Sequence, residues 1–137
     1  RIVAIIDIAK DDQQEARRLC GEIPQQIYSD ECFSQLGVFT ENYAYCISIA
    51  DELKSSQCLS DVSRLTKNPK ICETQKKTDW RDSCYLNVVR SEDYFKKGDS
   101  YDICAKINGT YYRSACDALK ADALYGQAVS GGTNSTG

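Results

Sequence analysis

The sequence predicts an all-α protein in which four disulfide-stapled helical hairpins form a short α-solenoid or a compact helical bundle. Three observations lead to this prediction: eight evenly spaced cysteines, a 26-residue repeat, and helix-breaking residues midway between paired cysteines. The chain has 137 residues, of which 42% are apolar and 27% charged, so it can bury a core and does not resemble a disordered chain. We expect an apolar N-terminal segment (1–11), a repeat domain (12–125) and a flexible Gly/Ser/Thr tail (126–137).

The cysteines form four successive pairs with eleven residues between the members of each pair, whereas the gaps between pairs are 13, 13 and 19 residues. Sequence alone allows on the order of a hundred connectivities for eight cysteines. Because the fixed spacing lies inside each pair, a covalent constraint within the pairs explains it, and a bridge across the variable gaps does not. We therefore predict the local disulfides Cys20–Cys32, Cys46–Cys58, Cys72–Cys84 and Cys104–Cys116.

Metal binding and catalysis explain the cysteines less well. Zinc and iron–sulfur sites typically use closely spaced cysteine pairs, and a catalytic cysteine needs a histidine partner. The chain has neither feature, so we expect no metal and no cofactor. Dense disulfides indicate an oxidising compartment, so we expect an extracellular or cell-surface protein, with the cytosol of a hyperthermophile as the one other setting. The start at Arg1 fits a leader that was removed or not included.

A sequence repeat underlies the cysteine spacing, because the first three modules begin 26 residues apart at Cys20, Cys46 and Cys72. An apolar residue precedes the first cysteine of every module: Leu19, Tyr45, Ile71 and Ile103. When the modules are aligned, two further positions, which we call columns, are apolar in the first three modules and polar in the fourth. The column one residue after the second cysteine holds Phe33, Leu59, Tyr85 and Asp117. The column four residues after it holds Leu36, Val62, Val88 and Lys120. Each hairpin is too small for a core of its own, so neighbouring hairpins must stack.

The N-terminal segment from Ile2 to Ala9 is the most apolar in the chain. One interpretation makes it a first helix that covers the open end of the first hairpin. The alternative makes it an assembly element, either a donated strand, for which its β-branched residues are suited, or the end of a longer export or pilin-type helix. In the assembly interpretation the subunit contacts come from Ile2, Val3, Ile5, Ile6 and Ile8.

The sequence of each module predicts two short helices separated by a bend. Pro24 interrupts the first module and Asn108-Gly109 the fourth, while Asp51 and Asp79 stand where an N-cap would open the second helix. An unbroken helix would place paired cysteines about 18 Å apart, too far for a disulfide. The bend brings the two cysteines face to face, so the breakers and the pairing support each other.

The insert from Arg90 to Asp99 separates modules three and four. We expect a lengthened helix end and a loop closed near Gly98, with a binding protrusion as the alternative. The tail after residue 125 has the composition of a flexible linker. Two N-glycosylation sequons begin at Asn108 and Asn134, and we expect N-linked glycan at these residues.

The best copy of the repeat is Ile71-Cys72-Glu73 followed by Asp79-Trp80-Arg81-Asp82-Ser83-Cys84-Tyr85. The modules resemble tandem helical-hairpin repeats of the tetratricopeptide and Sel1-like kind, in a cysteine-stapled form found in exported prokaryotic proteins, over residues 12–125. Their period is shorter than the usual one of about 34 residues, and the typical Trp, Gly and Pro signature positions are missing. The resemblance implies a scaffold or binding role, and no functional residue carries over from it.

Catalysis has few candidates in a chain without histidine. Three pairs of adjacent acids fit helix caps or a solvated face better than a glycosidase site: Asp11/Asp12, Asp30/Glu31 and Asp51/Glu52. The net charge of −3 does not favour nucleic-acid binding, and no apolar run reaches the roughly 20 residues of a membrane span. We expect the protein not to be an enzyme.

These features predict a non-enzymatic extracellular structural protein: a glycosylated subunit of a cell-surface filament or envelope assembly that self-associates through its N-terminal segment. The first alternative is a monomeric secreted module that binds a peptide, a lipid or a glycan in a groove of the array. A weaker alternative is a secreted enzyme inhibitor. Trp80 and the tyrosines lie mostly beside cysteines, where we expect core positions, with a sugar or partner contact at Tyr111-Tyr112 as the alternative.

Overall fold

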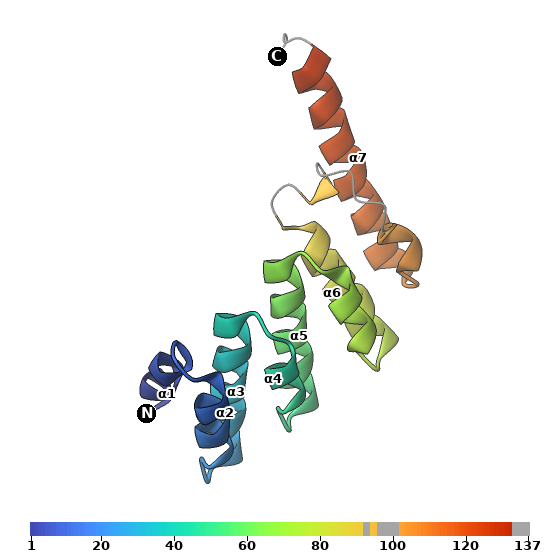
Figure 1. The fold of residues 1–137 in the computed structure, drawn as a ribbon. Helices are drawn as coiled ribbons and strands as arrows, with labels where there is room; N and C mark the ends of the chain where they lie inside the picture. Colours follow the sequence, from blue (N-terminus) through green and yellow to red (C-terminus); the bar gives the residue numbers. More distant parts are fainter. Residues whose placement is uncertain (92–93, 96–101, 133–137) are drawn as a thin grey trace.

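The structure, a computed structural model, describes residues 1–91, 94–95 and 102–132. All regular elements given for these residues are helical, which confirms the predicted all-α fold class. In chain order they are α1 (Ile2–Ala9), α2 (Gln13–Gly21), α3 (Gln26–Thr40), α4 (Ala44–Ile47), α5 (Glu52–Thr66), η1 (Pro69–Thr74), α6 (Thr78–Val89), η3 (Cys104–Lys106) and α7 (Thr110–Gly132). Figure 1 shows a row of hairpins with the two termini at opposite ends, as in a short α-solenoid.

Each module is a hairpin closed by its own disulfide, as predicted. The four bridges have Cα–Cα distances of 5.4 to 5.6 Å and join Cys20–Cys32, Cys46–Cys58, Cys72–Cys84 and Cys104–Cys116. They connect α2 to α3, α4 to α5, η1 to α6, and η3 to α7. All eight cysteines are buried, so the bridges are part of the core.

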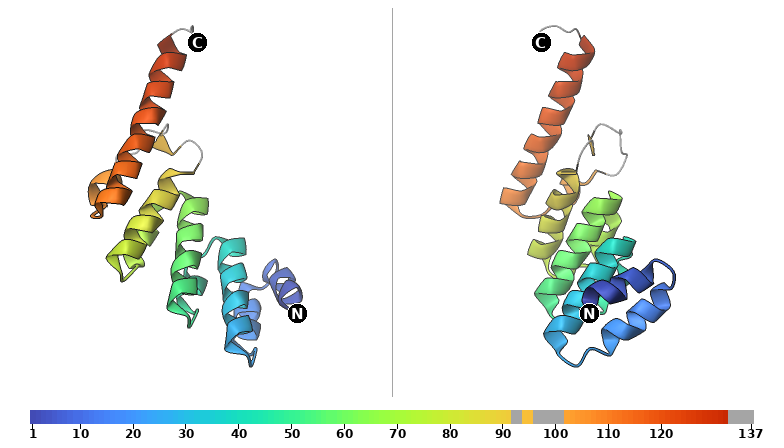
Figure 2. Two further views of the ribbon diagram at one scale, coloured as in Figure 1. Left: turned by 180° about the vertical axis from the view of Figure 1, so that it is seen from behind. Right: turned by 90° about the vertical axis from the view of Figure 1, so that its left-hand side faces the viewer.

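The two helices of a hairpin differ in length. The first helices have nine residues in α2 and four in α4, and they become 3₁₀ helices of six and three residues in η1 and η3. The second helices are longer, with fifteen residues in α3 and in α5, twelve in α6 and 23 in α7. The second helices therefore form the continuous layer of the array, which both views of Figure 2 show as a succession of neighbouring helices.

The bends of the hairpins lie where the sequence predicts them. Pro24 separates α2 from α3, and Asn108-Gly109 precedes α7. Asp51 caps α5, because its carboxylate accepts a hydrogen bond of 2.9 Å from the Lys54 N–H. The expected N-cap at Asp79 is wrong: α6 begins at Thr78, so Asp79 lies in the first turn, where its charge still interacts favourably with the helix dipole.

Buried aspartates connect neighbouring modules. Asp30 of α3 is only 3% exposed and accepts hydrogen bonds of 2.9 and 3.1 Å from the N–H groups of Ala50 and Asp51 in the bend of module two. Asp82 of α6 repeats this arrangement and accepts bonds of 3.2 and 2.8 Å from the two backbone amides at the bend of module four. Charge-assisted bonds of this kind fix the register of two hairpins.

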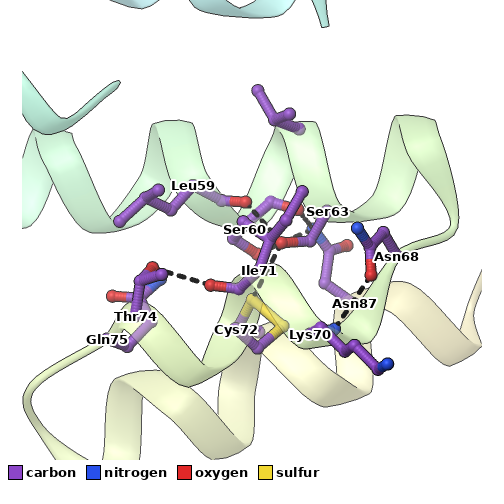
Figure 3. The surroundings of a disulfide bond; sticks show 12 residues. Leu59, Ser60, Ser63, Asn68, Lys70, Ile71, Cys72, Thr74, Gln75 and Asn87 are labelled. Atoms are coloured by element: carbon purple, nitrogen blue, oxygen red, sulfur yellow. Dashed lines mark hydrogen bonds between the residues drawn. A yellow bond between two sulfur atoms is a disulfide. The ribbon is translucent and has the colours of Figure 1, made fainter. Parts of the chain in front are cut away.

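The central disulfides pack against small residues of the preceding module. A Cβ atom at Gly37 would lie 3.1 Å from the sulfurs of both Cys46 and Cys58. At the equivalent position of α5, the Ser63 hydroxyl lies 3.5 Å from the Cys84 sulfur; Figure 3 shows Ser63 beside this disulfide. A larger side chain at either position would push the next hairpin away, so these residues set the spacing of the array.

The first two connections between modules have the same structure. Glu41 and Lys67 follow α3 and α5 in the left-handed conformation, with φ of 54° and 53°. The N–H of the next residue, Asn42 or Asn68, then donates a 3.0 Å hydrogen bond to the carbonyl five residues earlier. This Schellman-type closure ends both helices at the same point, which explains the equal length of the first two gaps.

The insert and the tail differ from expectation. The predicted lengthening of the helix before the insert is wrong, because α6 ends at Val89 and has fewer residues than α3 or α5. The expected loop near Gly98 lies outside the described residues. The flexible tail was predicted from residue 126, whereas α7 continues to Gly132; residues 133–137 lie outside the described part of the chain.

The exposed side of the last module differs from that of the other three. Leu36, Val62 and Val88 are fully buried between successive hairpins. The same column in α7 holds Lys120, and the neighbouring column holds the exposed Asp117. A further hairpin stacked on these two columns would have to bury these polar groups, which is costly. The exposed Leu124 and Tyr125 lie further along α7.

Candidate interaction surface

The eight cysteines and three of the acids considered for catalysis, Asp12, Asp30 and Asp51, have structural roles. The cysteines are all paired, and the described residues contain no group of three or more His, Cys, Asp or Glu side chains placed to hold a metal ion. Asp12 caps α2 by accepting a hydrogen bond of 3.1 Å from the Glu15 N–H, just as Asp51 caps α5. No helix in the described part of the chain has the length and apolar character needed to cross a membrane.

The N-terminal segment forms α1 and packs against α2 and α3. Ile5 is buried, and Ile2 and Ile6 are partly buried against the same core, so these three side chains hold α1 on the first hairpin. Val3 and Ile8 remain exposed, Val3 by 80%. The segment is therefore a helix rather than a strand, and of the five predicted assembly residues Val3 and Ile8 are the exposed ones.

The sequon residues lie in different surroundings. Asn108 is exposed in the bend before α7, and its backbone N–H is held by Asp82, so the bend is ordered while the side chain is accessible. Asn134 lies outside the described residues. The geometry thus leaves room for a glycan at Asn108.

An open groove of about 450 Å³ lies between modules two and three, on the side of their short first helices. We call it the Trp80 groove. Its floor is apolar and buried, with Ile49 and Leu59. Its walls are Ile47, which is 59% exposed, and the partly exposed ring of Trp80. Charged side chains form the rim: Glu52, Lys76 and Lys77.

The shortness of the first helices opens this groove. In module one, α2 has nine residues and runs alongside α3. In module two, α4 ends after four residues at Ile47, and in module three the 3₁₀ helix η1 ends at Thr74. The chain then passes through the bends with Ile49 and Lys76, so no helical turn covers the side of Leu59 that faces the groove.

Trp80 also borders a second, smaller hollow. This hollow of about 230 Å³ lies between α5 and α6 and is lined by Leu53, Ser60 and Asp61. Burial raises the pKa of Asp61 above its usual range, although the nearby Arg64 partly opposes the shift. Trp80 therefore stands between two hollows, with exposed apolar side chains on both sides.

The rim of the Trp80 groove carries an excess of positive charge. The Lys77 ammonium lies 4.3 Å from the centroid of the Trp80 ring and 4.0 Å from a Glu52 oxygen. Such a cation–π contact is worth about 0.5–1 kcal/mol at an exposed site, so it helps to orient both side chains. Lys76 is exposed, and the described residues give it no ion-pair partner.

The sequence did not reveal this surface, because Trp80 was expected in the core. The position of Trp80 in its module could have indicated this surface, because Trp80 lies in the first turn of a second helix, next to the bend. Large side chains in this turn are exposed in the other modules: Ile27, Leu53 and Tyr111. They stand five residues before the second cysteine, whereas Trp80 stands four residues before it. Tyr111 packs edge-on against Tyr112, with ring centroids 5.3 Å apart, and is itself outside the core.

A third hollow lies at the N-terminal end of the array, between α1 and α3. It has a volume of about 620 Å³ and is lined by the apolar Val3, Ile6 and Phe39, with Arg1 and Lys10 among the charged residues. Phe39 is half exposed. We call this the N-terminal surface. It is a second place where exposed apolar side chains gather instead of occurring singly.

Comparison of the chain with family models, with curated proteins and with solved structures gave no match.

Proposed function

We propose that the protein is a non-catalytic extracellular binding module whose partner docks in the Trp80 groove. The observation that carries this proposal is the exposed Ile47 and the Trp80 ring standing over the buried floor of Ile49 and Leu59. Concave apolar surfaces with a few polar groups at the rim are typical of binding sites, and aromatic anchors are enriched where partners bind. Four disulfides in one chain support an extracellular setting.

The fold supports a binding role because stacked hairpins present surfaces between neighbouring modules. The Trp80 groove lies between modules two and three, so its walls belong to α4 and α6, and its shape depends on the register of the stack. The disulfides Cys46–Cys58 and Cys72–Cys84 stiffen both modules. A preorganised groove loses little conformational entropy on binding, which favours affinity.

A displayed peptide library tests this proposal. Peptides selected on the full chain should lose at least tenfold in affinity for Trp80→Ala and for Ile47→Ser, measured by calorimetry. The substitution Tyr111→Ala, which removes an exposed aromatic ring far from the groove in sequence, should leave affinity unchanged. Circular dichroism checks that each variant is folded. Failure to select any binder, or equal binding by all variants, would refute the proposal.

Self-association through the N-terminal surface is the second candidate, favoured by the exposed Val3 and Phe39 beside the hollow between α1 and α3. It corresponds to the predicted cell-surface assembly. In α7 the two columns that are apolar in the first three modules hold Asp117 and Lys120, so this end does not repeat the apolar face of the other modules, although Leu124 and Tyr125 are exposed further along the helix. A pair related by a two-fold axis, with both N-terminal surfaces in contact, therefore suits the geometry better than an open filament.

Sedimentation velocity tests this second candidate. The wild-type chain should associate as its concentration rises, and Val3→Glu should abolish the association. Leu65→Glu places the same charge on an exposed apolar site of α5, outside the hollow, and should have no effect. If the wild type remains monomeric at every concentration, or if both variants behave alike, the second candidate is wrong.

The proposed glycosylation belongs to the same extracellular setting. We propose that Asn108 carries an N-linked glycan, because it is exposed in an ordered bend. Intact mass before and after enzymatic glycan release should show a loss in the wild type. The variant Asn108→Gln should lack the portion of this loss that one glycan accounts for. An identical mass change in both proteins would rule Asn108 out.

A further inference from the structure

We propose that the segment bound in the Trp80 groove is an extended peptide of a partner protein that presents a carboxylate beside an apolar side chain. This inference rests on the proposed function and adds the chemistry of the partner. Two observations carry it: the way equivalent bends elsewhere in the molecule bind a carboxylate, and the charge of the groove rim.

The bends of modules two and four each bind a carboxylate of the chain itself. Asp30 accepts hydrogen bonds of 2.9 and 3.1 Å from successive amides of one bend, and Asp82 accepts bonds of 3.2 and 2.8 Å from the other. The equivalent amides in module three belong to Lys76 and Lys77, which line the Trp80 groove. These two amides have no acceptor among the residues that the structure describes.

The chain lacks the acid that would fill this position. Ser56 occupies the place in α5 that Asp30 holds in α3, and a serine brings no negative charge. Gln75 fills the inner space instead, since its side-chain amide donates a 3.0 Å hydrogen bond to the Ser56 carbonyl. Lys76 and Lys77 line the Trp80 groove and are exposed, so the proposed carboxylate of the partner is placed on the groove side of this bend.

The charge of the rim matches such a ligand. Two lysines face one acid, Glu52, whose side chain is 79% exposed and lies no closer than 4.0 Å to Lys77. Lys76 has no ion pair within the described part of the chain. An apolar side chain of the partner would fill the space between Ile47 and Trp80. The adjacent carboxylate would then meet the two lysines and the amides of the bend.

Titration of the isotope-labelled full chain with three blocked pentapeptides tests this inference by nuclear magnetic resonance. The first peptide carries leucine and, two residues on, aspartate. The second has asparagine in place of the aspartate, and the third has serine in place of the leucine. The aspartate peptide should shift the amide signals of Lys76 and Lys77 and the indole signal of Trp80. Its dissociation constant should be at least about fivefold lower than those of the other two.

Charge variants of the chain complete the test. In Lys76→Gln/Lys77→Gln the preference for aspartate over asparagine should shrink to less than about twofold, whereas the control Lys70→Gln, outside the groove, should keep it. Equal binding of the aspartate and asparagine peptides in the groove would overturn this inference and leave the proposed function intact. Absence of shifts with all three peptides would also overturn it, and the library selection would then decide the proposed function separately.

Discussion

Asp30 makes the contact between modules one and two dependent on pH. Burial raises the pKa of this carboxyl, but hydrogen bonds from Ala50, Gln26 and Asp51 outweigh burial and hold the pKa below its usual range. Because the folded pKa is the lower one, the ionised carboxylate stabilises the fold at pH values above the unfolded pKa, near 4. This stabilisation is lost as the pH falls through the folded pKa.

Asp30→Asn removes the charge and one acceptor oxygen of this contact while keeping the size of the side chain. We expect a loss of about 1–3 kcal/mol in the free energy of unfolding at pH 7, measured with urea. The difference from the wild type should begin to shrink near pH 4, where Asp30 of the unfolded chain becomes protonated, and should disappear as the pH falls through the lower pKa of the folded protein. Asp11→Asn, at an exposed acid, serves as the control. A difference that stays constant down to pH 2 would contradict this assignment.

Gly37 sets the distance between α3 and the Cys46–Cys58 disulfide. Replacing a glycine inside a helix with alanine normally stabilises a protein by up to about 1 kcal/mol. At Gly37 the new Cβ would lie 3.1 Å from both sulfurs, so we expect Gly37→Ala to destabilise by about 1 kcal/mol or more. Gly126→Ala in α7, where nothing lies within 4 Å, should be neutral or stabilising. Urea unfolding of both variants decides, and stabilisation by both would refute the close packing.

At the scale of the element, the disulfides compensate for first helices that are too short to be stable alone. All four bridges close loops of the same sequence separation, so each contributes about 3 kcal/mol in the chain-entropy model. The folded modules differ, because α2 is an α-helix of nine residues while η1 is a 3₁₀ helix of six residues, although both have a side-chain N-cap. We therefore expect the stability of module three to depend more on its disulfide than the stability of module one does.

The variants Cys20→Ala/Cys32→Ala and Cys72→Ala/Cys84→Ala measure this difference. Both should destabilise, and the second should lose more, by about 1 kcal/mol or more, since the six-residue 3₁₀ helix η1 has less helical structure of its own than the nine-residue α2. Urea unfolding gives the free energies, and hydrogen exchange should show faster exchange in η1. If both variants lose the same free energy of unfolding, the two first helices depend equally on their disulfides and this prediction is wrong.

Much at this scale was predictable from the sequence. The fixed cysteine spacing predicted all four pairings, and Pro24, Asp51 and Asn108-Gly109 predicted bends, because these residues act through local geometry. The collapse of the first helices into 3₁₀ helices was not predictable, since it depends on packing against the neighbouring hairpin. The Trp80 groove was missed for the same reason: it exists only because two short helices of different modules leave the same space open.

At the scale of the whole molecule, the array has two different ends. Helix α1 covers the first hairpin with Ile5 and Ala9, while α7 presents Asp117 and Lys120 in columns that are apolar elsewhere. The sequence showed this departure of module four, and the structure shows that α7 packs on α6 of module three. A terminal hairpin with a polar outer side prevents unlimited stacking.

Apolar side chains at positions 117 and 120 should allow another molecule to stack on α7. We expect Asp117→Phe/Lys120→Leu to associate at concentrations where the wild type shows less association, measured by sedimentation velocity. Asp122→Phe adds a similar apolar group on another side of α7, about 140° around the helix axis from Asp117, so this variant should behave as the wild type does. No additional association in the double variant would show that these two columns do not face the next position of the array.

Each hairpin is closed by its own disulfide and stacks on its neighbours. Digestion of the unreduced protein with trypsin and a glutamate-specific protease cuts between all eight cysteines, so mass spectrometry of the linked peptides reads the connectivity directly. We expect the four links Cys20–Cys32, Cys46–Cys58, Cys72–Cys84 and Cys104–Cys116. A dominant link between cysteines of different modules, or free thiols in the native protein, would contradict this pairing.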